Sequence, residues 1–158
     1  MKITFTAFCL HLLIRLMPAQ EAQTPAISTI DTTNYPTLGK VIRLDPAIDD
    51  LLSESARIEM IGDGFVWAEG PVWINHKEGG YLLFSDIPRN SIMKWQEGLG
   101  VSLFMKPSGY TGATNYGNEP GSNGLLLDHK GRLLACEHGD RRISLLTALW
   151  VNAPIEIA

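Results

Sequence analysis

Two stretches of the chain, beginning at residues 69 and 123, repeat the same order of short apolar runs and turns. Each has a glycine at its second position (Gly70 or Gly124) and continues through a first apolar run, a turn, a second run and a third run. The two glycines stand 54 positions apart, and Ile92 and Ile143, which begin the third runs, stand 51 apart. A strand-only unit of about 50 residues is typical of β-propeller blades. Chance similarity of two hairpins is the alternative.

Blade geometry predicts which polar residues meet. The first strand of a blade lies nearest the central channel and the second returns antiparallel to it, so the start of one and the end of the other share one mouth. Those positions are Glu69 and 86–89 in the first repeat, and Asn123 and 137–140 in the second. The glycine-rich connection 107–122 has to arrive at this mouth, where we expect it to form a mobile lid.

The N-terminus has the pattern of an export signal. Lys2 precedes a mostly apolar stretch, 3–17, which is too short to cross a bilayer comfortably and contains Arg15. A buried helix is the alternative. We therefore expect residues 1–22 to be a signal peptide with an undetermined cleavage site. The protein would then be exported, periplasmic or secreted, and no later segment suggests a membrane span.

The rest of the chain divides by composition. Residues 23–56 are a spacer with one short helix near 45–52, where Asp45 caps and Pro46 fills the first turn. Residues 57–146 are expected to form the blades, and 147–158 leave the repeat pattern. The net charge is −4 and the sequence has no block of Lys and Arg, so nothing in it predicts a basic surface for binding nucleic acid. The oligomeric state is left open.

Four motifs, in this order, resemble the gluconolactonase/regucalcin family, also called the senescence marker protein family. They are 68–73 (AEGPVW), 83–88 (LFSDIP), 121–125 (GSNGL) and 136–142 (CEHGDRR). The resemblance implies an all-β fold, a six-bladed β-propeller, with a divalent metal, foremost calcium, in its channel. It also implies hydrolysis of sugar-type lactones by water, with the metal as Lewis acid on the lactone carbonyl. The expected partner is a small-molecule lactone.

The resemblance assigns roles to two residues at the predicted mouth. Glu69 would be a metal ligand, and Asn123 would contact the metal or the substrate. Carboxylate and amide oxygens are hard donors that suit calcium or magnesium. The structural alternatives are that Glu69 ends a strand in solvent and that Asn123 and Gly124 form an ordinary hairpin turn.

Other residues of the motifs leave alternatives open. His138 could contact the lactone or shuttle a proton, or it could fix the turn before Gly139. Asp86 is expected to cap a turn in preference to a catalytic role. The expected inter-blade packing residues are the tryptophans Trp67, Trp73 and Trp95.

The family's further metal ligands, an Asn and an Asp, and its expected base belong to later blades, which this sequence does not contain. The sequence thus predicts a C-terminally truncated member with about two blades, inactive or nearly so. Its segment 57–61 would be an unpaired edge strand. An inactive remnant or a non-catalytic propeller binding module is the alternative function. Serine-hydrolase, zincin and nucleotide-binding motifs do not occur in the sequence.

Overall fold

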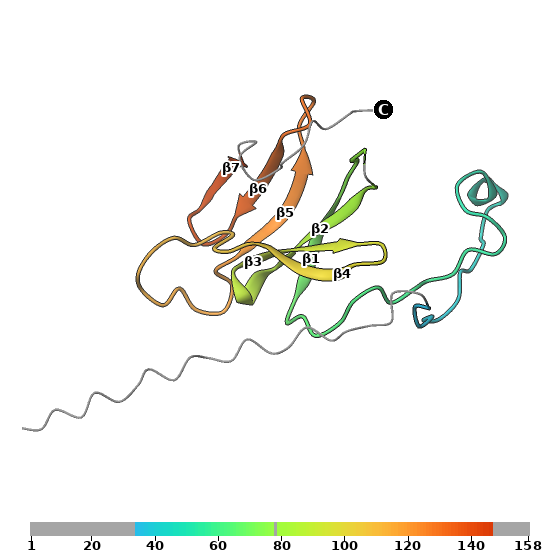
Figure 1. Ribbon diagram of the computed structural model, residues 1–158, viewed down its shortest axis with the longest axis horizontal. Helices are drawn as coiled ribbons and strands as arrows, with labels where there is room; N and C mark the ends of the chain where they lie inside the picture. Colours follow the sequence, from blue (N-terminus) through green and yellow to red (C-terminus); the bar gives the residue numbers. More distant parts are fainter. Residues whose placement is uncertain (1–33, 78, 147–158) are drawn as a thin grey trace, which may run out of the picture.

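Seven strands form two antiparallel sheets in the computed structural model, which describes residues 34–77 and 79–146 (Figure 1). The predicted signal peptide, 1–22, and the off-pattern tail, 147–158, lie outside the described residues. The first sheet contains β1 (Ala68–Ile74), β2 (Tyr81–Asp86), β3 (Ser91–Gln96) and β4 (Gly100–Met105), in that order. The second contains β5 (Ser122–Leu127), β6 (Leu133–Glu137) and β7 (Arg142–Leu146).

The two sheets are neighbouring propeller blades, so the predicted all-β propeller class is confirmed for the described part of the chain. Their first strands, β1 and β5, lie side by side, and β2 also contacts β5. Figure 1 shows the second sheet (orange to red) packed beside the first (green to yellow). In the portion described here, no helix has the length and apolar character needed to cross a membrane.

The core between the blades is mainly aliphatic. It consists of Ile74, Tyr81, Leu83, Ile92, Leu125, Leu133 and Ala135. The expectation that tryptophans fill this interface is wrong. Trp67 and Trp73 are about half exposed, and the buried Trp95 packs with Phe84 in a separate cluster. Side chains alternate between the faces of a strand, and Trp95 lies on the face opposite Ile92.

That separate cluster is covered by the segment preceding the blades. Tyr35, Ile61 and Phe65 pack against it, and the Phe65 and Phe84 rings meet edge to face with centroids 4.9 Å apart. The predicted unpaired edge at 57–61 is wrong, because this segment bonds to residues 36–38 instead. The Leu38 N–H donates to the Ile58 carbonyl at 2.9 Å, and the Met60 N–H to the Pro36 carbonyl at 2.8 Å.

The short helix predicted near 45–52 is present as a 3-10 helix, η1 (Pro46–Asp50). Asp45 caps it, accepting the Ala47 N–H at 2.8 Å, and Pro46 lies in the first turn. The helix buries none of its residues, and Leu51 just after it is 79% exposed. Capping and the proline therefore account for this turn, which lies away from both sheets (Figure 1).

The blades approach each other closely at Gly70. Its φ is +63°, and a Cβ there would lie 2.2 Å from the Asn123 carbonyl oxygen. Beside this point the fully buried Ser85 hydroxyl donates to the same carbonyl at 2.9 Å and lies 2.8 Å from the Ser122 hydroxyl. We call Gly70, Ser85, Ser122 and the Asn123 backbone the blade seam.

We expect Gly70→Ala to separate the blades or to distort β1. The left-handed conformation alone costs a non-glycine residue about 1–2 kcal/mol, and the overlap with Asn123 adds to it. Gly98→Ala is the matched control, because Gly98 has φ +71° but no atom within 4 Å of its Cβ position. Chemical denaturation measures both variants. Equal losses of unfolding free energy would contradict a close contact at Gly70.

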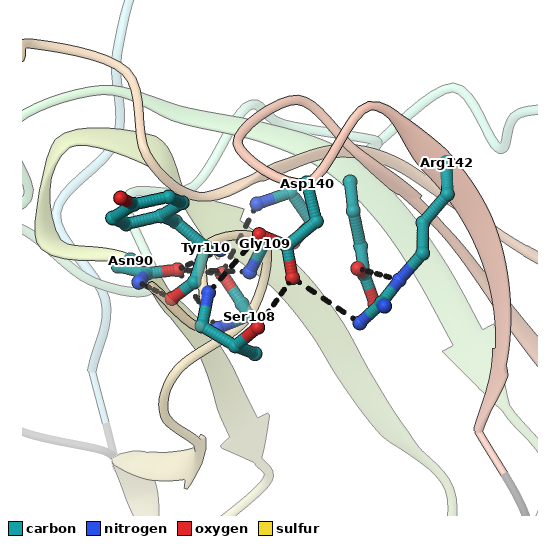
Figure 2. Close-up of polar contacts among 9 residues, drawn as sticks. Asn90, Ser108, Gly109, Tyr110, Asp140 and Arg142 are labelled. Carbon is teal, nitrogen blue, oxygen red and sulfur yellow. Dashed lines mark hydrogen bonds and ion pairs between the residues drawn. The ribbon is translucent and has the colours of Figure 1, made fainter. Parts of the chain in front are cut away.

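The connection between the blades is anchored by Asn90 (Figure 2). Its side-chain oxygen accepts backbone N–H groups of Ser108 at 2.9 Å, Gly109 at 2.8 Å and Tyr110 at 3.3 Å. Its amide nitrogen donates to the Tyr110 carbonyl at 2.8 Å. The expected lid thus begins in a tightly bonded turn, and its mobility remains a prediction for the residues beyond.

A second anchor lies on the turn between β6 and β7. The Thr111 hydroxyl donates to Asp140 at 2.7 Å and the Thr111 N–H does so at 3.2 Å. Both bonds lower the pKa of the Asp140 carboxyl, and the bond from the Thr111 hydroxyl has the larger effect. The Asp140 N–H in turn donates to the Gly109 carbonyl at 2.6 Å. The connection is therefore tied to both blades.

Asn90→Gly should lower the free energy of unfolding by about 1–3 kcal/mol, the usual cost of leaving buried donors without an acceptor. Glycine accepts the left-handed φ of 53° at Asn90, so the variant isolates the side-chain bonds. Asn118→Ala, at an exposed position of the same connection, is the control and should change stability by less than about 0.5 kcal/mol. Similar denaturation midpoints for the two variants would remove Asn90 as the anchor.

Candidate functional site

The structure brings Glu69 and Asn123 together. The Asn123 amide nitrogen donates to Glu69 Oε1 at 2.8 Å, and both side chains are partly buried. The two residues lie at equivalent places, near the starts of β1 and β5. In both blades the strand register shifts there, between Glu69 and Val72 and between Ser122 and Leu125. Such β-bulges change the direction of side chains at strand ends, and they were not predicted from the sequence.

The side-chain oxygens of Glu69 and Asn123 are of the type that a hard cation prefers, but two ligands are too few to complete its coordination. A carboxylate and an amide oxygen are what calcium or magnesium prefer. The amide now turns its nitrogen to Glu69, and rotation about the last side-chain bond of Asn123 would present its oxygen instead. Within the described ranges, no group of three or more His, Cys, Asp and Glu side chains could hold a metal. The metal role of Glu69 and Asn123 stays a prediction.

His138 lies on the turn after β6 with a defined ring orientation. Its Nδ1 is 2.8 Å from the Glu119 carbonyl oxygen, which can only accept, so Nδ1 donates. In the neutral ring Nε2 therefore has a free lone pair. The Glu119 carboxylate lies 3.8 Å from Nδ1. The Tyr116 hydroxyl donates to the His138 backbone carbonyl at 3.1 Å, which fixes the turn as well.

Asn123 and His138 share one open depression of about 480 Å³. Its other lining residues are Cys136, Glu137, Arg141, Arg142 and Ile143. Glu69 lines a different pocket of about 240 Å³, whose other lining residues are mainly apolar. The Glu69–Asn123 contact therefore lies between the mouth depression and an apolar pocket. Polar chemistry at this mouth is available from Asn123, His138 and the arginines.

Two buried carboxylates at the mouth have structural partners. Asp86, fully buried, accepts the N–H groups of Val66 and Trp67 and pairs with Arg89 at 2.7 Å. Asp86 precedes the 3-10 turn η2 (Ile87–Arg89), but its side chain makes no capping bond to that turn, so the predicted capping role is wrong. Its bonds hold the entry to β1 instead.

Glu137 stands 51 positions later, at the equivalent end of β6, and was not singled out from the sequence. It is 8% exposed and pairs with Arg142 at 2.6 Å. Its place in the repeat and in the motif 136–142 were the sequence signals for it.

No protein-family model matches the chain. A gluconolactonase from Zymomonas mobilis subsp. mobilis is 42% identical over 112 residues, covering 70% of this chain and 31% of that protein. A crystal structure assigned to a gluconolactonase is 31% identical with a TM-score of 0.51, covering 65% of this chain and 31% of the other. The structure of a gluconolactonase from Xanthomonas campestris is 23% identical with a TM-score of 0.52. The match covers 78% of this chain and 35% of the Xanthomonas chain, and it supports the fold alone.

This chain thus spans about a third of the length of the relatives it matches. The matching motifs, the paired blades and the identity to the Zymomonas protein point to one conclusion. The chain belongs to the gluconolactonase family.

Proposed function

We propose that the mouth formed by Glu69 and Asn123 serves metal-dependent hydrolysis of sugar-type lactones. The observation that supports it most is the 2.8 Å contact between these side chains, which joins the first strands of two blades. The relatives named gluconolactonases support the lactone as substrate class.

Glu69 and Asn123 would hold a divalent cation, foremost calcium, by their side-chain oxygens. When bound, such an ion acts as a Lewis acid on the lactone carbonyl. His138 would lie at the substrate side of the mouth, because it shares the depression with Asn123. Since its Nδ1 donates to Glu119, its Nε2 is the atom that contacts the lactone or accepts a proton from water.

The proposed site is weak in the 158-residue chain. Calcium takes about six to eight oxygen ligands, and the described residues bring two oxygen-bearing side chains together here. Water would complete the coordination. We therefore expect low metal affinity and residual turnover at most. A chain that binds lactone without calcium-dependent turnover would support the alternative, a non-catalytic binding module.

Glu69→Gln should weaken calcium binding at least about tenfold, because it removes the one formal charge of the pair. Calorimetric titration of the purified 158-residue chain with calcium measures the affinity. Glu97→Gln is the control, since Glu97 is exposed at the β3–β4 turn. If the Glu69 and Glu97 variants bind calcium as tightly as the parent chain, Glu69 is not a ligand.

His138→Gln should lower calcium-dependent lactone hydrolysis by about 10²-fold or to the uncatalysed rate, as expected for loss of a proton-transfer group. A pH-stat assay with δ-gluconolactone follows the acid released, and the Zymomonas gluconolactonase serves as positive control. His129→Gln, at an exposed turn in the same blade, should leave the rate unchanged. Unaltered turnover in the His138 variant would restrict that residue to fixing its turn.

A further inference from the structure

Two residues at equivalent places in the blades adopt the left-handed backbone conformation. Asn90 has φ 53° and Arg141 has φ 56°, and they stand 51 positions apart, the same offset as the third strands. Asparagine tolerates this conformation, whereas arginine adopts it only at a cost in free energy. Such strained residues cluster at functional sites. In the first blade the side chain in this conformation, that of Asn90, binds the connection between the blades. Arg141 occupies the equivalent position in the second blade.

Arg141 has an available guanidinium. In the part of the chain that the structure describes, it forms no hydrogen bond or ion pair, and it lies over the Tyr116 ring with 5.9 Å from guanidinium carbon to ring centroid. The adjacent Arg142 differs, because it pairs with Glu137 at 2.6 Å and with Asp140 at 3.3 Å. The donors of Arg141 are thus free for a ligand.

Arg141 borders a second depression of about 650 Å³, whose other lining residues are Tyr116, Asn118, Glu119 and His138. Its walls are held together by the bond from the Tyr116 hydroxyl to the His138 carbonyl and by that from His138 Nδ1 to the Glu119 carbonyl. His138 and Arg141 line this depression and the one containing Asn123, so the two adjoin. We call this second depression the connection subsite.

The connection subsite offers donors, acceptors and an aromatic ring together. Arg141 donates only, Glu119 accepts, and the Asn118 amide, which has no side-chain partner among the described residues, does both. One positive and one negative side chain at its rim favour a neutral ligand over an anion. Ligand sites commonly combine a few placed polar groups with aromatic side chains. Vicinal hydroxyl groups on a ring match this set.

We propose that the connection subsite binds the hydroxyl groups of a neutral sugar-type ring, with Arg141 as the specificity-determining donor. The inference rests on the proposed function in that the ring is that of the lactone, whose carbonyl would lie toward Asn123. Arg141 would then distinguish hydroxylated lactones from plain ones. A site built to hydrogen-bond a hydroxyl rejects the analogue lacking it, because its polar groups are left without partners.

The test is binding of D-glucono-δ-lactam, a neutral analogue that resists hydrolysis, to the full 158-residue chain in the presence of a chelator. Amide chemical shifts in two-dimensional NMR spectra report the affinity and confirm that each variant is folded. We expect the lactam to bind at least about tenfold more tightly than δ-valerolactam, which has no hydroxyl groups. Arg141→Gly and Arg141→Asn should each lose at least about tenfold in affinity. Both residues suit a positive φ, so the Tm should stay or rise.

Arg132→Gln is the control, because Arg132 pairs with Asp128 at 2.6 Å in the β5–β6 turn, outside the connection subsite, and its loss should not change lactam affinity. Equal affinity of the parent chain and the Arg141 variants, equal affinity for the two lactams, or no lactam binding would each overturn the proposal. The chelator makes the result independent of the metal. Arg141-dependent binding with no calcium-dependent hydrolysis would uphold the subsite while the proposed hydrolysis fails.

Discussion

The contact between β1 and β5 at the blade seam positions everything that the mouth can do. Glu69 and Asn123 flank the point where the Gly70 α-carbon meets the Asn123 carbonyl, so their side chains meet only while the strands stay that close. The buried serines Ser85 and Ser122 provide the hydrogen bonds that satisfy this polar strip inside an aliphatic interface. The seam therefore couples packing of the blades directly to the geometry of the proposed site.

Much of the fold could be predicted from the repeat, because a blade is a local unit whose strands pair in chain order. The Glu69–Asn123 contact followed from that topology. Which face of the first sheet packs against the second blade could not be predicted, and β3 shows the physical reason. Ile92 belongs to the core between the blades, while Met93 and Trp95 belong to the cluster on the other face. A strand buried on both faces has no apolar alternation, so its sequence does not show which side meets the neighbour.

The polar contacts of the mouth were harder to predict, because they join segments far apart in the sequence. The bond between His138 and Glu119 spans 19 residues and that between Thr111 and Asp140 spans 29. The charge of the buried Glu137 is compensated by Arg142, which lies on the neighbouring strand β7. A turn sequence shows that a polar residue is present, but the partner depends on how the connection folds back. The fixed tautomer of His138 is a consequence of this kind.

The segment that covers Phe84 and Trp95 comes before them in the chain. Because a ribosome releases the N-terminal residues first, Tyr35, Ile61 and Phe65 are already available when β2 and β3 emerge. The aromatic face of the first sheet can then be shielded from water as soon as it forms. The second sheet is synthesised later, when the aliphatic face of the first sheet is already available to pack against it. The order of the sequence thus matches the order in which each layer needs a partner during synthesis.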